Sequence, residues 1–192
     1  MAKNKKLIII IASVFVLALL VVGIIIFFMG KDDKPEGIEY DVYDAVPQEF
    51  VESYVSMLEQ RSGADFLAIN PDGYYEGLYD SHESLQKGFT SAEDLAVRIM
   101  LDYDFYSECG EPVEITYEIL ESKEVTNEPG KTEGTTLLQQ IKGSFEEDGY
   151  TLKTNQIFFV NLKLSISGEN GQAEDEHKFY CCNIPGEGWT LV

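Results

Sequence analysis

The stretch FFVNLKLSI, residues 158–166, decides the fold of this chain. Its even-numbered positions are all apolar, and its odd-numbered positions are polar apart from Phe159. Because successive side chains of a strand point to opposite faces, this alternation predicts a strand with one buried and one solvated face. Residues 168–171, GENG, predict a turn, and residues 173–184 predict the strand that returns beside it, with Phe179 and Cys181 facing inward.

Two further strands extend the pattern in both directions. Downstream, residues 185–188 (PGEG) predict a second turn and residues 189–192 (WTLV) a last short strand. Upstream, Pro112 opens a strand in which the apolar positions alternate with acidic and hydroxyl residues, and these apolar positions are Val113, Ile115, Tyr117 and Ile119.

Helices are predicted mainly before the strands. A first helix begins between Asp44, a candidate cap, and Pro47, and it ends at Gly63 after Arg61. Its apolar positions at helical spacing are Phe50, Val51, Tyr54, Val55 and Leu58. A short helix over residues 64–70 is stopped by Pro71, and residues 71–89 are expected to form a loop.

Two capping boxes mark the later helices. The box Thr90-Ser91-Ala92-Glu93 predicts a long helix to about Tyr106, closed by Cys109 and Gly110. After a loop over residues 126–134, the box Thr136–Gln139 predicts an amphipathic helix that ends near Gly149. The expected fold is therefore α+β, with helices packed on one face of a curved, mostly antiparallel sheet.

This order of elements resembles the cone-shaped domains of the nuclear-transport-factor-2-like family, which includes ketosteroid isomerase and scytalone dehydratase. The resemblance rests on the helix Phe50–Leu58, the strand Ile157–Ile166 and the ending Gly186–Leu191, and it covers most of residues 44–192. The expected helix over residues 136–145 departs from the family pattern. The resemblance implies a pocket inside the cone, with ligand-pocket candidates Tyr54, Tyr103, Tyr106, Tyr117 and Phe158.

The N-terminal part predicts a membrane anchor. Residues 7–29, LIIIIASVFVLALLVVGIIIFFM, carry no charge, and a helix of 23 residues would span roughly 34 Å, more than a hydrocarbon core of about 30 Å. A buried core helix is rarely apolar on every face over this length. A cleaved signal peptide has a shorter apolar run and a small-residue cleavage site, which residues 27–31 do not offer.

Charges flanking the anchor predict its orientation. Lys3, Lys5 and Lys6 precede it with no acidic residue, so residues 1–6 are expected in the cytoplasm. Residues 30–43 would be a juxtamembrane linker, and residues 44–192 a single domain outside the cell membrane.

The domain that follows the anchor is strongly acidic. The chain carries a net charge of −20, of which residues 1–30 contribute +3, so the remaining part carries −23. Such a domain repels nucleic acid and anionic lipid headgroups. The charge suits solubility, loosely held cations or a basic partner.

Catalytic and metal signals are weak. His82 and His177 lie in polar segments without a nucleophile motif or a phosphate loop and are expected at the surface. An acid or base inside the cone would be Asp102, Asp104 or Tyr117. Oxygen ligands for a cation could come from Asp102 and Asp104 or from an acidic cluster over residues 169–176. Neither group has the spacing of a calcium-binding loop, so no metal or cofactor is predicted.

The pattern of the three cysteines allows two interpretations of their bonding. Cys181 and Cys182 are adjacent and would point to opposite faces of a strand, so a bond between them would be strained. Either could pair with Cys109, or all three are buried thiols that pack as small apolar residues.

These observations predict a membrane-anchored, extracytoplasmic domain that binds a ligand or partner without catalysis. An isomerase-like or dehydratase-like enzyme with a carboxylate in the cone is the first alternative. An accessory subunit that docks on another envelope protein is the second.

Overall fold

A computed structural model describes residues 40–101 and 105–192 of the chain. The predicted tail, the anchor over residues 7–29 and most of the linker therefore lie outside the described residues. No helix within the two described ranges combines the length and the apolar content that crossing a membrane requires. The described part forms a unit of its own from Tyr40 to Val192.

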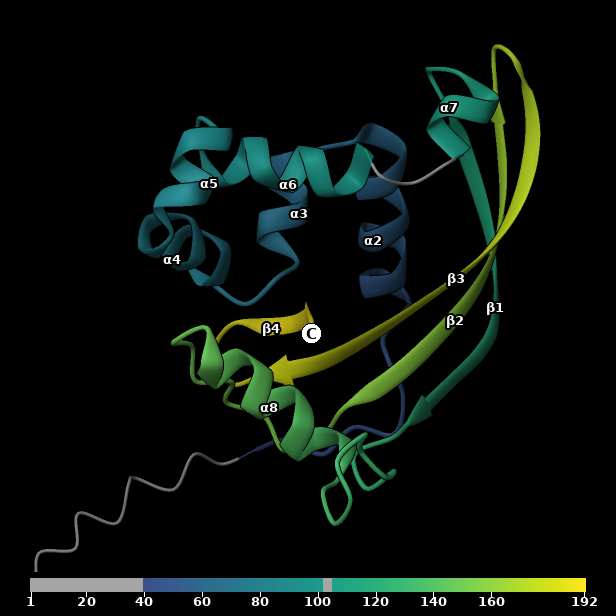
Figure 1. Cartoon of the computed structure of the whole chain (residues 1–192). Coiled ribbons are helices and arrows are strands. Elements are labelled where there is room, and N and C mark those ends of the chain that lie inside the picture. Colours follow the sequence, from purple (N-terminus) through teal and green to yellow (C-terminus); the bar gives the residue numbers. More distant parts are fainter. Residues whose placement is uncertain (1–39, 102–104) are drawn as a thin grey trace, which may run out of the picture. The chain divides into compact units, whose positions relative to one another are not determined.

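The sheet is an antiparallel meander of four strands. Its strands are β1 (Glu114–Glu124), β2 (Phe158–Gly168), β3 (Gly171–Ile184) and β4 (Gly188–Leu191), and they lie in the order β1-β2-β3-β4. The three long strands curve strongly around the helices (Figure 1). The predicted strands and both turns are thus confirmed, and the fold class is α+β.

Alternation along β2 is also confirmed. Side chains at the even positions from Phe158 to Ile166 are all at most 1% exposed. They form the concave face of the sheet, which packs against the helices, and the odd positions form what we call the outer face. The pairs Leu162↔His177 and Ser165↔Glu174 extend the two faces onto β3.

The first strand departs from the prediction in its second half. Ile119 was expected on the buried face, but it is 42% exposed. The register shifts between Ile119 and Glu121, so that Leu120 is an extra residue of a β-bulge. The strand then continues to Glu124, and all residues from 118 to 124 are exposed. Ile119 continues the regular alternation of β1, but it is exposed because the helices no longer cover the strand at this position.

The first two helices lie close to their predicted positions. Helix α2 (Gln48–Gln60) follows Pro47, which takes the capping position without a side-chain hydrogen bond, so the predicted cap by Asp44 is wrong. Arg61 ends α2 in the left-handed conformation. Gly63 instead begins α3 (Gly63–Ala68), where a Cβ atom would lie only 2.6 Å from the Glu93 carbonyl oxygen. Glycine is needed there because of this close approach.

Residues 71–89 are not a loop, contrary to the prediction. They contain the short helices α4 (Tyr74–Ser81) and α5 (Glu83–Gly88), neither of which has a fully buried residue. The sequence did not predict these two helices because neither has a stripe of apolar residues along one face. Aromatic contacts hold α4 instead, since the Tyr74 ring lies 4.6 Å from Phe145 and the Tyr75 ring 5.2 Å from Phe66, centre to centre.

The predicted long helix corresponds to α6 (Ala92–Leu101) and α7 (Phe105–Cys109). Ser91, not Thr90, caps α6, because its Oγ accepts a hydrogen bond of 3.1 Å from the Asp94 N–H. Asp94 in turn accepts a bond of 2.9 Å from the Thr90 N–H. The predicted capping box of Thr90 and Glu93 is therefore wrong: Ser91 is the cap, and Asp94 accepts from the residue before it.

Helix α8 (Leu137–Glu147) has the predicted capping box of Thr136 and Gln139. It covers a second, smaller core of Val125, Phe145, Leu152, Ile157, Cys182 and Ile184. The main core lies between the concave face and helices α2, α3, α6 and α7. Both cores belong to one compact unit.

Candidate functional site

The concave face is filled by side chains. Tyr54 of α2 is only 3% exposed, and its ring lies 4.3 Å from that of Phe179, centre to centre. The Tyr106 hydroxyl donates to the Leu58 carbonyl, and the Arg61 guanidinium lies 4.6 Å from the centre of the Tyr106 ring. Phe158 is fully buried. These predicted pocket residues are therefore parts of the main core.

The two other pocket candidates differ. Tyr117 is half-buried on β1. Tyr103 lies outside the described residues, as do the candidate acids Asp102 and Asp104. None of the surface hollows described in this section is lined by Tyr54, Tyr106, Tyr117 or Phe158.

His177 is not a surface histidine, contrary to the prediction. Its register with Leu162 places it on the concave face, where its side chain is only 11% exposed. The ring lies 5.8 Å from that of Tyr54, and Nδ1 lies 3.4 Å from Asp175 Oδ2. Burial lowers the pKa of His177, while the Asp175 carboxylate opposes this shift. His82, in contrast, is exposed as predicted.

The acidic cluster over residues 169–176 does not converge on one point. Glu174 and Glu176 lie on the outer face, where they contact Lys163 and Lys178, whereas Asp175 between them lies on the concave face. Period-two alternation therefore separates the carboxylates that the sequence brings together. Within residues 40–101 and 105–192, no group of three or more potential metal ligands occurs.

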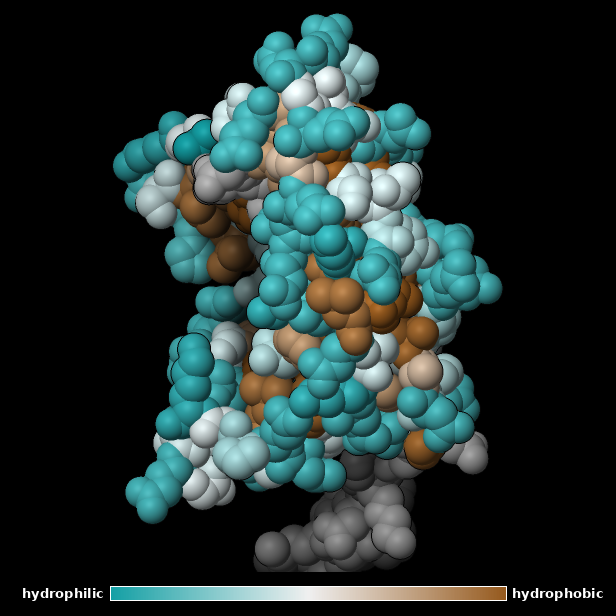
Figure 2. Space-filling model, turned by 90° about the vertical axis from the view of Figure 1, so that its right-hand side faces the viewer, coloured by the Kyte–Doolittle hydropathy of each residue, from teal (hydrophilic) through white to brown (hydrophobic). Residues whose placement is uncertain are grey.

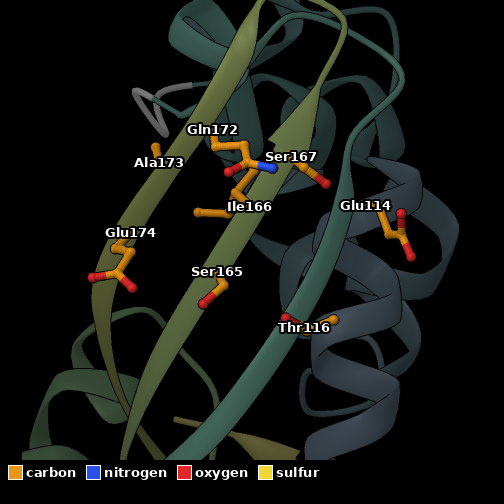
Figure 3. Close-up of a pocket in the computed structure, with 8 residues that line it drawn as sticks. All are labelled: Glu114, Thr116, Ser165, Ile166, Ser167, Gln172, Ala173 and Glu174. Carbon is orange, nitrogen blue, oxygen red and sulfur yellow. The ribbon is translucent and has the colours of Figure 1, made fainter.

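A trough lies on the outer face, above β2. It has a volume of about 460 Å³ and is lined by Glu114, Thr116, Ser165, Ile166, Ser167, Gln172, Ala173 and Glu174. Figure 3 shows the short side chains of Ser165 and Ser167 on the central strand, between Glu114 of β1 and Gln172 and Glu174 of β3. Two cross-strand rows build it, Glu114–Ser167–Gln172 and Thr116–Ser165–Glu174. The trough is hollow because small side chains occupy the middle strand.

The remaining rows of the outer face each contain a lysine with a carboxylate partner. Lys163 Nζ lies 2.9 Å from Glu174, Lys178 Nζ 3.1 Å from Glu176, and Lys123 Nζ 3.3 Å from Glu121. These partners raise the pKa values of Lys163 and Lys123. Glu114, at the far end of the trough, forms no ion pair with a described residue.

Large apolar side chains are exposed at the bulge of β1, where Ile119 pairs with Leu162 of the concave face, and on the outer face of β3. Ile119 and Leu120 at the bulge of β1 are 42% and 48% exposed, and Tyr180 of β3 is 37% exposed. Figure 2 looks onto the side of the molecule with the outer face and shows hydrophobic residues at the surface, surrounded by hydrophilic ones. Tyr180 also lies 5.6 Å from Phe159, centre to centre. Exposed apolar side chains that form a contiguous patch are typical of interaction sites.

One buried polar atom of the outer face has no hydrogen-bond partner among the described residues. Asn161 is 8% exposed, and its Nδ2 donates a bond of 2.6 Å to Glu176. Its buried Oδ1 accepts no hydrogen bond from any residue that the structure describes. Buried acceptors are nearly always satisfied, so this amide is an unusual feature of the surface that bears the trough.

Other hollows lie among the helices. One is bounded by α2 and α3 and includes Glu49, Glu52 and Asp65, and another includes Arg61 and Glu111, which form an ion pair. Both lie at the surface and mix carboxylates with apolar side chains. Neither is lined by a histidine or a cysteine.

The cysteines are free and buried. Cys181 lies in the main core and Cys182 in the smaller one, so adjacent residues serve opposite faces of the strand. Burial raises the pKa of both thiols, that of Cys182 to about 12, which keeps them protonated and unreactive at neutral pH.

Of the trough residues, only Glu174 was singled out from the sequence, as part of the acidic cluster over residues 169–176. Alternation predicted that Thr116 and Ser165 face solvent, but not that they are neighbours, because pairing register cannot be obtained from one strand alone.

Comparison with models of protein families, with characterised proteins and with solved structures finds no match to this chain.

Proposed function

We propose that this chain is a single-pass membrane protein whose outward-facing domain docks on another envelope protein and catalyses no reaction. Residues 7–29 would be the anchor and residues 1–6 the cytoplasmic tail. The likeness to the nuclear-transport-factor-2-like cone is part of this proposal, and helices on the concave side of an antiparallel meander support it.

One observation carries the docking proposal. The concave face, where a cone would hold a ligand, is occupied by side chains such as Tyr54, whereas large apolar side chains are exposed at the bulge of β1 and on the outer face of β3. Burying an apolar side chain contributes about 1.5–3 kcal/mol, so Ile119, Leu120 and Tyr180 offer a favourable contact to a partner.

Site-specific photo-crosslinking in cells of the source organism tests the docking. A photoreactive amino acid replaces Leu120 or Tyr180 in two variants, and Lys87, exposed on α5, in a control. We expect the same crosslinked product from positions 120 and 180 and none from position 87. Equal products from all three positions, or no product from positions 120 and 180, would contradict docking through this face.

Cysteine labelling tests the topology. The three native thiols of this chain are buried, so a membrane-impermeant maleimide added to intact cells should label this chain only at an introduced cysteine. Lys87→Cys should react in intact cells, whereas Lys3→Cys should react only after lysis. The opposite pattern, or a mature protein that begins near residue 30, would refute the proposed topology.

A second candidate is an enzyme of the isomerase or dehydratase kind. The observation that favours it is the Asp175–His177 pair on the concave face, with a carboxylate 3.4 Å from an imidazole. Such a pair can transfer protons at a carbon or oxygen of a substrate. If the domain converts an enolisable ketone, Asp175→Asn should remove the activity without loss of stability, and an unchanged rate would exclude this role.

A further inference from the structure

We propose that the trough on the outer face binds basic side chains of the docking partner, carried by an extended segment with arginine or lysine at alternating positions. This inference rests on the proposed docking function and names the chemistry of the partner. The trough is formed by the rows Glu114–Ser167–Gln172 and Thr116–Ser165–Glu174.

The distribution of lysines on the outer face is the first reason. Three cross-strand rows below the trough contain Lys123, Lys178 and Lys163, and each of these lysines contacts a carboxylate. The two trough rows contain no lysine or arginine. Glu174 is reached only by Lys163 from the neighbouring row, and Glu114 has no ion pair with a described residue. A cation that pairs with Glu114 must therefore come from outside the described residues.

Geometry is the second reason. Glu114 and Glu174 lie on the two strands that flank β2, offset by two residues along it. With strands about 4.8 Å apart and a rise of about 3.3 Å per residue, their Cα atoms are roughly 12 Å apart. Alternating residues of an extended segment are about 7 Å apart. Two long basic side chains on the same face of such a segment can therefore reach both carboxylates.

The trough floor is the third reason. An arginine guanidinium has five N–H donors and no acceptor. The hydroxyls of Thr116, Ser165 and Ser167 and the amide oxygen of Gln172 can accept from these donors, while Glu114 and Glu174 supply the negative charge. An anionic ligand would instead meet two carboxylates. The net charge of −23 after residue 30 also attracts a basic partner over a longer range.

The test measures fluorescence anisotropy of a defined peptide on the full-length chain in neutral detergent. The probe is Gly-Arg-Ser-Arg-Ser-Arg-amide with an uncharged fluorophore, and the control peptide has citrulline, an uncharged isostere, at each arginine position. The test variant is Glu114→Gln with Glu174→Gln. The matched control is Glu83→Gln with Glu147→Gln, exposed on α5 and α8, which removes the same charge. It likewise includes one lysine-paired glutamate and one with no ion pair in the part of the chain that the structure describes.

We expect saturable binding of the arginine peptide, weakened about threefold to tenfold in the test variant and less than about twofold in the control variant, as partly exposed ion pairs predict. The citrulline peptide should not bind. Equal weakening in both variants would show attraction to the whole acidic surface and overturn the trough as a site. Absence of saturable binding, or equal binding of the citrulline peptide, would overturn it as well.

The crosslinking experiment separates this inference from the proposed function. If peptide binding fails but positions 120 and 180 still crosslink to one product, docking stands and only the trough assignment fails. If the crosslinked product is also absent, the docking function itself fails. With both intact, Glu114→Gln with Glu174→Gln should reduce the crosslinked product in cells, and the control variant should leave it unchanged.

Discussion

Replacing Phe158 tests whether the concave face is a packed core or a ligand pocket. Phe158 is fully buried on the central strand, and its ring lies 5.3 Å from that of Trp189, centre to centre. In a packed core, Phe158→Ala loses the transfer free energy of the ring and leaves a cavity, which together cost about 3–5 kcal/mol of unfolding free energy. For a domain of this size, this corresponds to a fall in Tm of about 6–20 °C.

The neighbouring residue provides the control. Phe159 lies on the outer face, where it is only half-buried and contacts Tyr180. We expect Phe159→Ala to cost about 1 kcal/mol, because less apolar area is lost from the protein interior. Urea denaturation of residues 40–192, followed by circular dichroism, measures both variants. A loss below about 1 kcal/mol for Phe158→Ala, or equal losses in the two variants, would refute the packed concave face and restore Phe158 as a pocket residue.

Three smaller perturbations test the local interactions. Burial lowers the pKa of His177 in the folded domain, so the unfolded chain binds a proton at this histidine first as the pH drops, and the unfolding free energy should fall below about pH 6.5. His177→Gln should flatten this fall between about pH 7.5 and 5.5. An unchanged pH dependence of the unfolding free energy in denaturation curves would refute the reasoning. Thr136→Ala removes the hydroxyl half of the capping box with Gln139 and should cost about 1 kcal/mol in the same assay, whereas no loss would mean that the cap does not stabilise α8. Tyr74→Phe removes a hydrogen bond of 2.6 Å to Asp148 but keeps the ring contacts, so we expect a loss of about 1 kcal/mol, and a loss above about 3 kcal/mol would show that the hydroxyl holds α4.

Local sequence patterns predicted the strands well. The alternation from Phe158 to Ile166 specifies both a strand and its buried face, because side chains alternate with period two whatever surrounds them. The capping box at Thr136 and the turns around Gly171 and Gly188 are equally local, since each depends on residues within a few positions. Helix α2 was predicted for the same reason, from apolar residues at helical spacing.

Prediction failed where contacts between distant residues decide the structure. Helices α4 and α5 have no apolar stripe, and α4 is held partly by the ring of Phe145, which lies 71 positions after Tyr74 in the sequence. The exposure of Ile119 follows from a bulge and from where the helices stop covering β1. His177 reads as polar and exposed among acidic neighbours, yet its register with Leu162 turns it inward beside Tyr54.

Local sequence patterns were sufficient to predict the α+β class, the face of each residue along β2, the acidic surface and a membrane anchor. These properties depend on composition and on periods of a few residues. Only the tertiary structure decided that the predicted pocket residues Tyr54, Tyr106 and Phe158 pack together, and that Glu114, Ser165 and Glu174 share one trough. The reason is that packing and cross-strand register bring together residues that are distant in the sequence, such as Tyr54 and Phe179, and no local pattern encodes which of them become neighbours.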